Sequence, residues 1–275
     1  MNLYFKIGVL IHAAWAMSQL DLDRTHQYTH YAAAAYCPGT DFECKSCTGV
    51  NGRYVNTLNS ELLDTSGYIA VDESDKRIVL AFRGTRDIEN DITDLSFLLT
   101  AMLGTPFGAL VHVGFKAAME SLAPTFLPSI KELVSRPEYA DYSVAVVGHS
   151  LGGAIASLAT VKLHYSLGMA WEKMELYTYG QPRTGNVVFA KWLSQQPLGS
   201  SRVVHRNDVI PHLAFGLLGS YVHHQNEVWL REEAVVLCNP SVLEDPNCSY
   251  SIPIAQLSLA DHLVYFNITL GIYGC

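Results

Sequence analysis

The chain has 275 residues, of which 49% are hydrophobic and only 16% are charged, and its formal net charge is −8 at pH 7. This length fits one large domain or two small ones, and the apolar content is enough for one sizeable core. The negative charge and the lack of any basic run exclude nucleic acid and anionic lipid as partners, because phosphate recognition needs clustered lysine and arginine.

The first residues have the pattern of a secretory signal. Lys6 gives a weakly positive start, residues 7–14 are apolar, and an Ala-Trp-Ala motif offers a cleavage site. The apolar stretch is shorter than the roughly 20 residues that a membrane span needs. We therefore expect residues 1–16 to be a signal peptide and residues 17–275 to form a single domain that is exported without a stable membrane anchor. An ordinary N-terminal core helix is the alternative.

Strand and helix patterns alternate along the rest of the chain. This alternation is typical of a mostly parallel sheet that is covered by helices on both faces. Pro124 and Pro128 lie inside one helix pattern and must kink or split it. The apolar run 98–103 predicts, in part, a core strand. The expected strands are 68–71, 77–82, 142–147, 176–179, 202–205 and 227–230, and the expected helices are 21–36, 115–134, 151–165 and 187–193.

Ser150 lies in the most informative segment of the chain. Residues 148–153 read Gly-His-Ser-Leu-Gly-Gly and connect the apolar strand 142–147 to an alanine-rich helix. A serine in this context sits on a tight, strained turn that holds its hydroxyl above the sheet, and the flanking glycines allow the close approach. The helix N-terminus aims its amides at the space where negative charge develops in acyl transfer. The pattern predicts a nucleophile; the alternative is a chance Gly-x-Ser-x-Gly loop.

A nucleophilic serine needs a histidine as general base and an acid that orients the histidine. On this type of fold the acid and then the histidine follow the serine along the chain. Asp208 is the candidate acid because it comes just after the strand 202–205; the alternative is a loop residue that caps a backbone amide. His262 comes late and after the acid, which favours it over His205 and His223, but the residues alone leave all three open.

Several separated stretches of the chain resemble the secreted class 3 lipases of filamentous fungi and yeasts, a family with feruloyl esterase relatives. The resemblance covers nearly the whole length after the N-terminal segment, with the stretches in the family's order. It implies an α/β-hydrolase fold, with a mostly parallel central sheet, helices on both faces and a short lid helix. The matching stretches are residues 82–85, 111–115, 148–153, 177–186, 204–213, 221–229 and 262–266.

The resemblance also implies a role for each catalytic position. The family's nucleophile falls on Ser150, its acid on Asp208 and its base on His262. Its oxyanion hole falls on Thr85, which would donate a backbone N–H and a hydroxyl, and on the backbone N–H of Leu151. One such donor contributes on the order of 3 kcal/mol to the transition state. These roles imply a serine carboxylic-ester hydrolase that works through an acyl-enzyme and needs no metal or cofactor.

One segment matches the family's lid. Ile88, Ile92 and Leu95 are spaced i, i+4 and i+7, so they share one face of a helix whose opposite face is acidic. Asp91 stands where many relatives carry a tryptophan, which makes this lid polar. An ordinary surface helix is the alternative interpretation, because helical periodicity alone does not distinguish the two.

These features together predict a secreted lipase that acts on triacylglycerols or other lipid esters, at an oil–water interface. The apolar loops 98–108 and 214–218 favour esters of medium or long fatty acids, although packing under a loop is their alternative role. The rival functions are a feruloyl-type esterase on plant cell-wall esters, which a polar lid suits, a phospholipase A1, and an inactive secreted binding protein. The complete triad and oxyanion hole argue against the last. We expect a monomer.

The chain has six cysteines, an even number that is consistent with three disulfide bonds in an oxidising compartment. Cys44 and Cys47 form a Cys-x-x-Cys motif, which we interpret as a short structural disulfide because no second such motif completes a zinc site. The family resemblance implies two further pairs. These pairs are Cys37 with Cys275, and Cys238 with Cys248.

Overall fold

The computed structural model describes residues 22–37, 39, 41–88, 98–213 and 221–275. The expected signal peptide at residues 1–16 and the apolar loop 214–218 lie outside these ranges. The same holds for three of the four expected lid residues, Asp91, Ile92 and Leu95.

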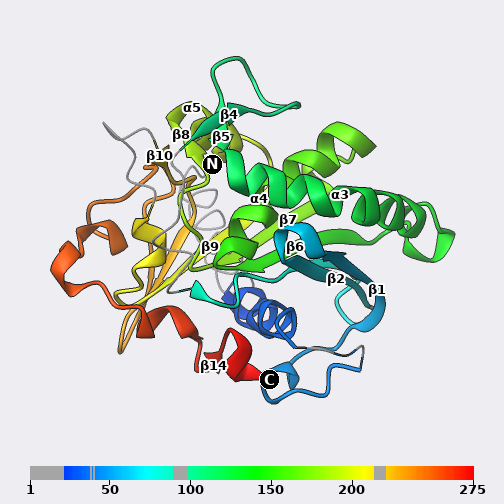
Figure 1. Cartoon of the computed structure of the whole chain (residues 1–275), viewed down its shortest axis with the longest axis horizontal. Helices are drawn as coiled ribbons and strands as arrows, with labels where there is room; N and C mark the ends of the chain where they lie inside the picture. Colours follow the sequence, from blue (N-terminus) through cyan, green and yellow to red (C-terminus); the bar gives the residue numbers. More distant parts are fainter. Residues whose placement is uncertain (1–21, 38, 40, 89–97, 214–220) are drawn as a thin grey trace, which may run out of the picture.

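An eight-stranded sheet forms the centre of the structure (Figure 1). Its strand order is β1-β2-β3-β6-β7-β9-β11-β12. The strands β3, β6, β7, β9 and β11 are parallel neighbours, whereas β1, β2 and β12 pair antiparallel at the two edges. The bounds are β1 (Arg53–Ser60), β2 (Thr65–Asp72), β3 (Arg77–Phe82), β6 (Ser143–His149), β7 (Met174–Tyr179), β9 (Gly199–His205), β11 (Glu227–Leu230) and β12 (Val235–Leu237). The prediction of a mostly parallel sheet is confirmed.

Helices cover both faces of this sheet. One face packs against α3 (Val113–Val134), α4 (Leu151–Leu167) and α5 (Val187–Ser194), and the other packs against the helix over residues 22–34 (Figure 1). The two cores follow from strand alternation, since successive side chains point to opposite faces. On β3, Leu80 belongs to the core under α3 and α4, whereas Val79 belongs to the core around the N-terminal helix.

The helix α3 continues through both of its prolines, so of the two expected effects, a kink or a split, the split does not occur. Pro124 and Pro128 are four residues apart and both are exposed, so they share the solvent-facing side of the helix. Each proline removes one N–H···O=C bond. On this side water can satisfy the carbonyl groups that lose a partner, while the buried side of the helix keeps its packing.

A second, smaller sheet has the strand order β10-β8-β5-β4. Its strands are β4 (Leu99–Ala101), β5 (Leu110–His112), β8 (Gly185–Asn186) and β10 (Tyr221–Val222), and a separate two-stranded ribbon consists of β13 (Val264–Tyr265) and β14 (Ile268–Thr269). The strand predicted within residues 98–103 is present as β4, but its placement in the core is wrong, because β4 is a partly exposed edge strand that pairs with β5. Leu98 and Leu103, on either side of β4, are exposed.

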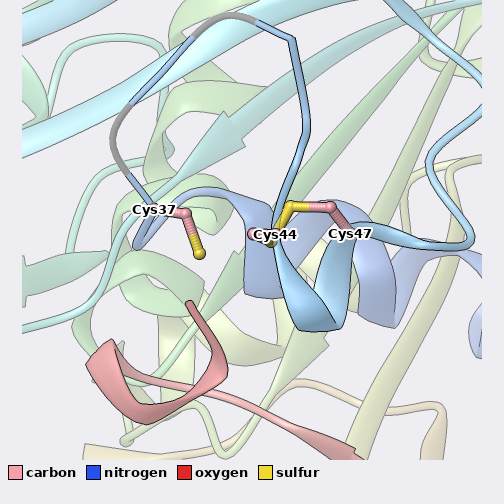
Figure 2. A group of neighbouring side chains, drawn as sticks. All are labelled: Cys37, Cys44 and Cys47. Atoms are coloured by element: carbon pink, nitrogen blue, oxygen red, sulfur yellow. A yellow bond between two sulfur atoms is a disulfide. The ribbon is translucent and has the colours of Figure 1, made fainter.

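Three disulfide bonds join the cysteines in the pairs that the family resemblance and the Cys-x-x-Cys motif imply: Cys37–Cys275, Cys44–Cys47 and Cys238–Cys248. Figure 2 shows Cys44 and Cys47 joined, with Cys37 beside them. The three sulfur atoms lie within 4.8 Å of one another. Disulfide sulfurs are not thiolates, so this cluster offers no set of metal ligands. The first bond ties the C-terminus to the end of the N-terminal helix.

Removing the bond between Cys37 and Cys275 is expected to lower the free energy of unfolding by about 2–5 kcal/mol, because it closes a loop of 238 residues. The double variant Cys37→Ser/Cys275→Ser tests this in urea denaturation. The matched control, Cys44→Ser/Cys47→Ser, opens a loop of 3 residues and should cost clearly less. Equal losses from the two pairs would contradict the expectation.

Among the helices of the described residues, none combines the length and the apolar content that crossing a bilayer requires.

Candidate active site

The strand β6 and the helix α4 meet at Ser150. The backbone of this serine has φ 58° and ψ −131°, a sparsely populated conformation that non-glycine residues adopt at a strained turn. Two glycines make the turn possible. A Cβ on Gly148 would lie 2.1 Å from the carbonyl oxygen of Gly152, and one on Gly152 would lie 2.3 Å from the carbonyl oxygen of Phe82. The strand and the helix therefore approach as closely as the sequence pattern predicts.

Asp208 and His262 form a hydrogen-bonded pair in the interior. Both side chains are fully buried, and His262 Nδ1 donates to Asp208 Oδ2 over 2.7 Å. A carboxylate oxygen only accepts, so Nδ1 carries the proton and Nε2 is the acceptor of the neutral ring. Nε2 is buried and has no hydrogen-bond partner within the described part of the chain. The pair thus presents an unused basic nitrogen.

Two further donors hold the carboxylate of Asp208. The backbone N–H of Ile210 donates to Oδ1 over 2.8 Å, and the hydroxyl of Tyr265 donates to Oδ2. Burial and the nearby Asp208 carboxylate both raise the pKa of Tyr265, which keeps its phenol protonated and able to donate. The sequence assigned no role to Tyr265. Tyr265 lies three residues after His262, but this spacing does not reveal its contact with Asp208 without the structure.

The two loops that carry Asp208 and His262 are joined through their backbones. Ser258 N donates to Asn207 O over 2.8 Å, and Val209 N donates to Ser258 O over 3.2 Å. This pairing flanks Asp208 on both sides and brings it to His262 across 54 residues of sequence. It fixes the carboxylate relative to the imidazole before any substrate binds.

The other two candidate histidines have different hydrogen-bond partners. His205 Nδ1 donates to the carbonyl oxygen of Asp261 over 2.9 Å, and His223 Nε2 donates to that of Pro211 over 2.7 Å. Both rings use a backbone carbonyl as partner. Of the three candidates, His262 is the one whose ring is seen bonded to the Asp208 carboxylate among the described residues.

His149 links the serine turn to His262. Its ring lies against the ring of His262, with the centroids 4.3 Å apart, and its Nε2 donates to the carbonyl oxygen of His262 over 2.9 Å. Because Nε2 is the donor, Nδ1 of the neutral ring accepts, and the hydroxyl of Tyr36 donates to it over 2.7 Å. His149 directly precedes Ser150, so this contact holds the imidazole of His262 beside the turn. Sequence reasoning gave neither His149 nor Tyr36 a role.

The segment after β3 also reaches the serine turn. A Cβ on Gly84 would lie 2.9 Å from the Cβ of Ser150, so only glycine fits there. Thr85 follows and is half-buried, and Leu151 is the first residue of α4. Thr85 lines a pocket of about 210 Å³ together with His149, Ile88, Leu263 and Ile272. Both candidate oxyanion donors thus lie next to the turn, and apolar side chains form part of the pocket wall.

Three buried histidines make stability depend on pH. Burial, together with the neighbouring His262 ring for His149 and Arg202 for His223 and His224, lowers their pKa values, to about 3 for His224. The unfolded chain protonates near pH 6.5. Between pH 6.5 and about 3 the unfolded state therefore binds more protons, and stability falls as the pH falls.

We expect wild type to lose about 2 kcal/mol more than a His224→Gln variant when the pH drops from 7 to 5, since one displaced histidine contributes about 1.4 kcal/mol per pH unit over this window. Urea denaturation of both proteins at the two pH values measures the difference. The carboxylates are common to both proteins and cancel. Identical losses would show that His224 does not stay neutral in the folded state.

The sheet is mostly parallel and has helices on both faces, and Ser150 lies on a strained turn at the end of the central strand β6. These features define an α/β-hydrolase fold. The chain belongs to the class 3 lipase family, whose family model matches residues 79–217.

Known members of the family match over most of the chain. A lipase from Rhizopus niveus is 34% identical over 89% of this chain and 63% of its own length. Secreted mono- and diacylglycerol lipase A from Penicillium camembertii is 33% identical over 78% and 72%. A solved triacylglycerol lipase, described as having a serine protease triad as its catalytic centre, superimposes with a TM-score of 0.83 at 32% identity, over 91% of this chain and 96% of the other. The chain thus spans under two thirds of the Rhizopus relative.

Proposed function

We propose that this protein hydrolyses carboxylic esters of lipids through a triad of Ser150, His262 and Asp208. The Oγ atom of Ser150 attacks the ester carbonyl while His262 Nε2 takes its proton, and the protonated ring then donates that proton to the leaving alcohol. Thr85 and the backbone N–H of Leu151 stabilise the oxyanion. Water repeats the sequence on the acyl-enzyme and releases the fatty acid.

One observation carries this proposal: the bond between His262 Nδ1 and Asp208 Oδ2, which leaves Nε2 without a hydrogen-bond partner among the described residues and close to the serine turn. A general base needs a free lone pair and a fixed tautomer, and this arrangement supplies both. The lowered pKa of neighbouring His149 keeps that ring neutral, so it places no positive charge against the imidazolium that forms during turnover.

Lipid esters are the substrates that the pocket and the relatives favour. Ile88, Leu263 and Ile272 give the pocket beside Thr85 an apolar wall that suits an acyl chain or the alcohol part of an acylglycerol. The matching relatives include enzymes named for triacylglycerols and for mono- and diacylglycerols. We propose the same class of substrate here, with medium or long acyl chains.

The proposal includes the setting in which the enzyme works. Export after removal of residues 1–16 fits the three disulfide bonds, which form in oxidising compartments. Residues 17–275 would then be one catalytic domain that acts as a monomer at an oil–water interface. Residues 86–95 would serve as the lid, and Ile88 is the one expected lid residue that the structure describes.

Two measurements test the function. Incubation with diisopropyl fluorophosphate should add one phosphoryl group at Ser150, detected by peptide mass spectrometry, and Ser150→Ala should not be labelled. A panel of tributyrin, olive-oil emulsion, phosphatidylcholine and methyl ferulate should then give the highest rates on the acylglycerols. If Ser150 is labelled but only methyl ferulate is hydrolysed, the protein is a feruloyl-type esterase. If only phosphatidylcholine is hydrolysed, it is a phospholipase A1. The absence of labelling would leave a non-catalytic binding protein.

A further inference from the structure

His212 connects Asp208 to the residue that directly follows a disulfide-closed loop. It ends the single 3₁₀ turn Ile210–His212, and its side chain is buried. Its Nδ1 lies 3.0 Å from the backbone carbonyl oxygen of Asp208, and its Nε2 lies 3.0 Å from that of Ser249. A neutral imidazole carries one N–H, so it donates to one of the two carbonyl oxygens at a time, while its other nitrogen lies against the second. The ring therefore acts as a spacer between the two backbone segments.

The far end of this spacer is fixed. Ser249 follows Cys248, whose bond to Cys238 closes the loop, and Ser249 N donates to Glu227 Oε1 over 3.0 Å. Glu227 lies on β11 and pairs with the buried Arg202 over 2.6 Å. Asp245 holds the interior of the loop by accepting the N–H groups of its neighbours. The carbonyl that His212 contacts thus belongs to the residue that directly follows the disulfide-closed loop, and this residue is bonded to the central sheet through Glu227.

Arg183 makes a second connection between the disulfide-closed loop and the turn after Asp208. The buried Arg183 binds Glu244 Oε1 through Nε over 2.6 Å, and its NH1 donates to the carbonyl oxygen of His212 over 2.8 Å. Glu244 lies inside the loop that the Cys238–Cys248 bond closes. The turn after Asp208 is therefore held by two sets of contacts, one through the ring of His212 and one through the backbone carbonyl of His212.

We propose that His212 is a positioning residue for Asp208, and that the Cys238–Cys248 loop acts on the catalytic acid through it. This inference rests on the proposed function. A shift of the Asp208 backbone moves the carboxylate relative to His262, and a misplacement of about 1 Å in a catalytic constellation costs roughly 100-fold in rate. The described hydrogen bonds of the His212 ring go to backbone carbonyls and not to Ser150 or His262. We therefore expect it to affect the rate constant of chemistry and not substrate binding.

The test is the hydrolysis of p-nitrophenyl butyrate. The concentration of active protein is determined by titrating Ser150 with diisopropyl fluorophosphate, and kcat is calculated from it. Unfolded protein, which is not labelled, then does not enter the comparison. We expect His212→Leu to lower kcat roughly 10- to 100-fold with KM within about twofold, and His212→Gln, which keeps one donor group, to lose less. The control His164→Leu removes a ring that also bonds a backbone carbonyl, that of Met169, at the far end of α4, and should leave kcat unchanged.

A double-mutant cycle tests the path through the loop. The variant Cys238→Ser/Cys248→Ser should lower kcat by itself. When it is combined with His212→Leu, the fold-loss of kcat should be smaller than the product of the two separate fold-losses. A full product would show that the loop does not act through His212, and an unchanged kcat in His212→Leu would overturn the positioning role. Wild type that neither hydrolyses the ester nor takes up the label would instead refute the proposed function.

Discussion

Replacing Ser150 by alanine is expected to lower kcat by about 10⁶-fold, which corresponds to about 8 kcal/mol of the activation barrier. The reason is that the acyl-enzyme route needs the hydroxyl, and nothing else at the serine turn offers a nucleophile in the same place. KM should change little, because the substitution leaves the pocket beside Thr85, the proposed substrate site, intact. Initial rates on tributyrin with purified protein measure the loss.

The matched control for this variant lies on the same helix. Ser157 is buried in α4 and donates to the carbonyl oxygen of Gly153 over 3.1 Å, so Ser157→Ala removes an equal group without touching the turn. We expect its kcat within about twofold of wild type. If Ser150→Ala kept more than a hundredth of the wild-type rate, another residue would have to be the nucleophile.

The Asp208→Asn variant should lower kcat by about 10⁴-fold while the protein stays folded. An amide has a donor as well as an acceptor, so it can turn its NH₂ toward His262 Nδ1 and favour the tautomer with the proton on Nε2. That tautomer cannot accept the proton of Ser150. The same change also weakens the stabilisation of the imidazolium that forms in the transition state.

Asp261→Asn is the control that isolates this effect. Asp261 directly precedes His262, and its carboxylate accepts from Asn207 N over 3.3 Å, a contact that the amide oxygen of asparagine can keep. We expect a loss of less than about threefold. A loss in Asp261→Asn as large as in Asp208→Asn would transfer the role of the acid to the neighbouring carboxylate.

The sequence predicts the turn at Ser150 well because every determinant is local. An apolar strand, glycines at positions 148 and 152 and an alanine-rich helix lie within about 25 residues, and each acts on the backbone next to it. The parallel strands β3 and β6 are equally readable, since burial on both faces makes them continuous apolar runs. The family resemblance added the pairing of the cysteines, which local chemistry does not encode.

The pair of Asp208 and His262 is different, because it depends on contacts between distant segments. The backbone pairing around Ser258 brings Asp208 to His262, and the contact between the rings of His149 and His262 places the pair beside the serine turn. Neither contact can be read from the local sequence pattern. For this reason the residues alone could not separate His262 from His205 and His223. The supporting roles of Tyr36 and Tyr265 were missed for the same reason.

Short or polar strands were also missed. The strand β1 buries only Leu58 of its eight residues, so it lacks an alternating apolar pattern. The strands of the small sheet have two or three residues each, too few to show a period. The apolar run around β4 was misread as core, because hydrophobicity does not distinguish an edge strand beside an exposed loop from a buried one.

The central claim is that Ser150, His262 and Asp208 form one continuous path for a proton. A crystal structure of the protein inactivated by an alkylphosphonate ester tests it most directly, because phosphorus then takes the place of the ester carbonyl carbon. The account predicts a bond from phosphorus to Oγ of Ser150, His262 Nε2 within about 3 Å of an oxygen on the adduct, and the phosphonyl oxygen facing the N–H groups of Thr85 and Leu151. Phosphorus bound to another residue, or a His262 ring turned away from the adduct, would contradict it.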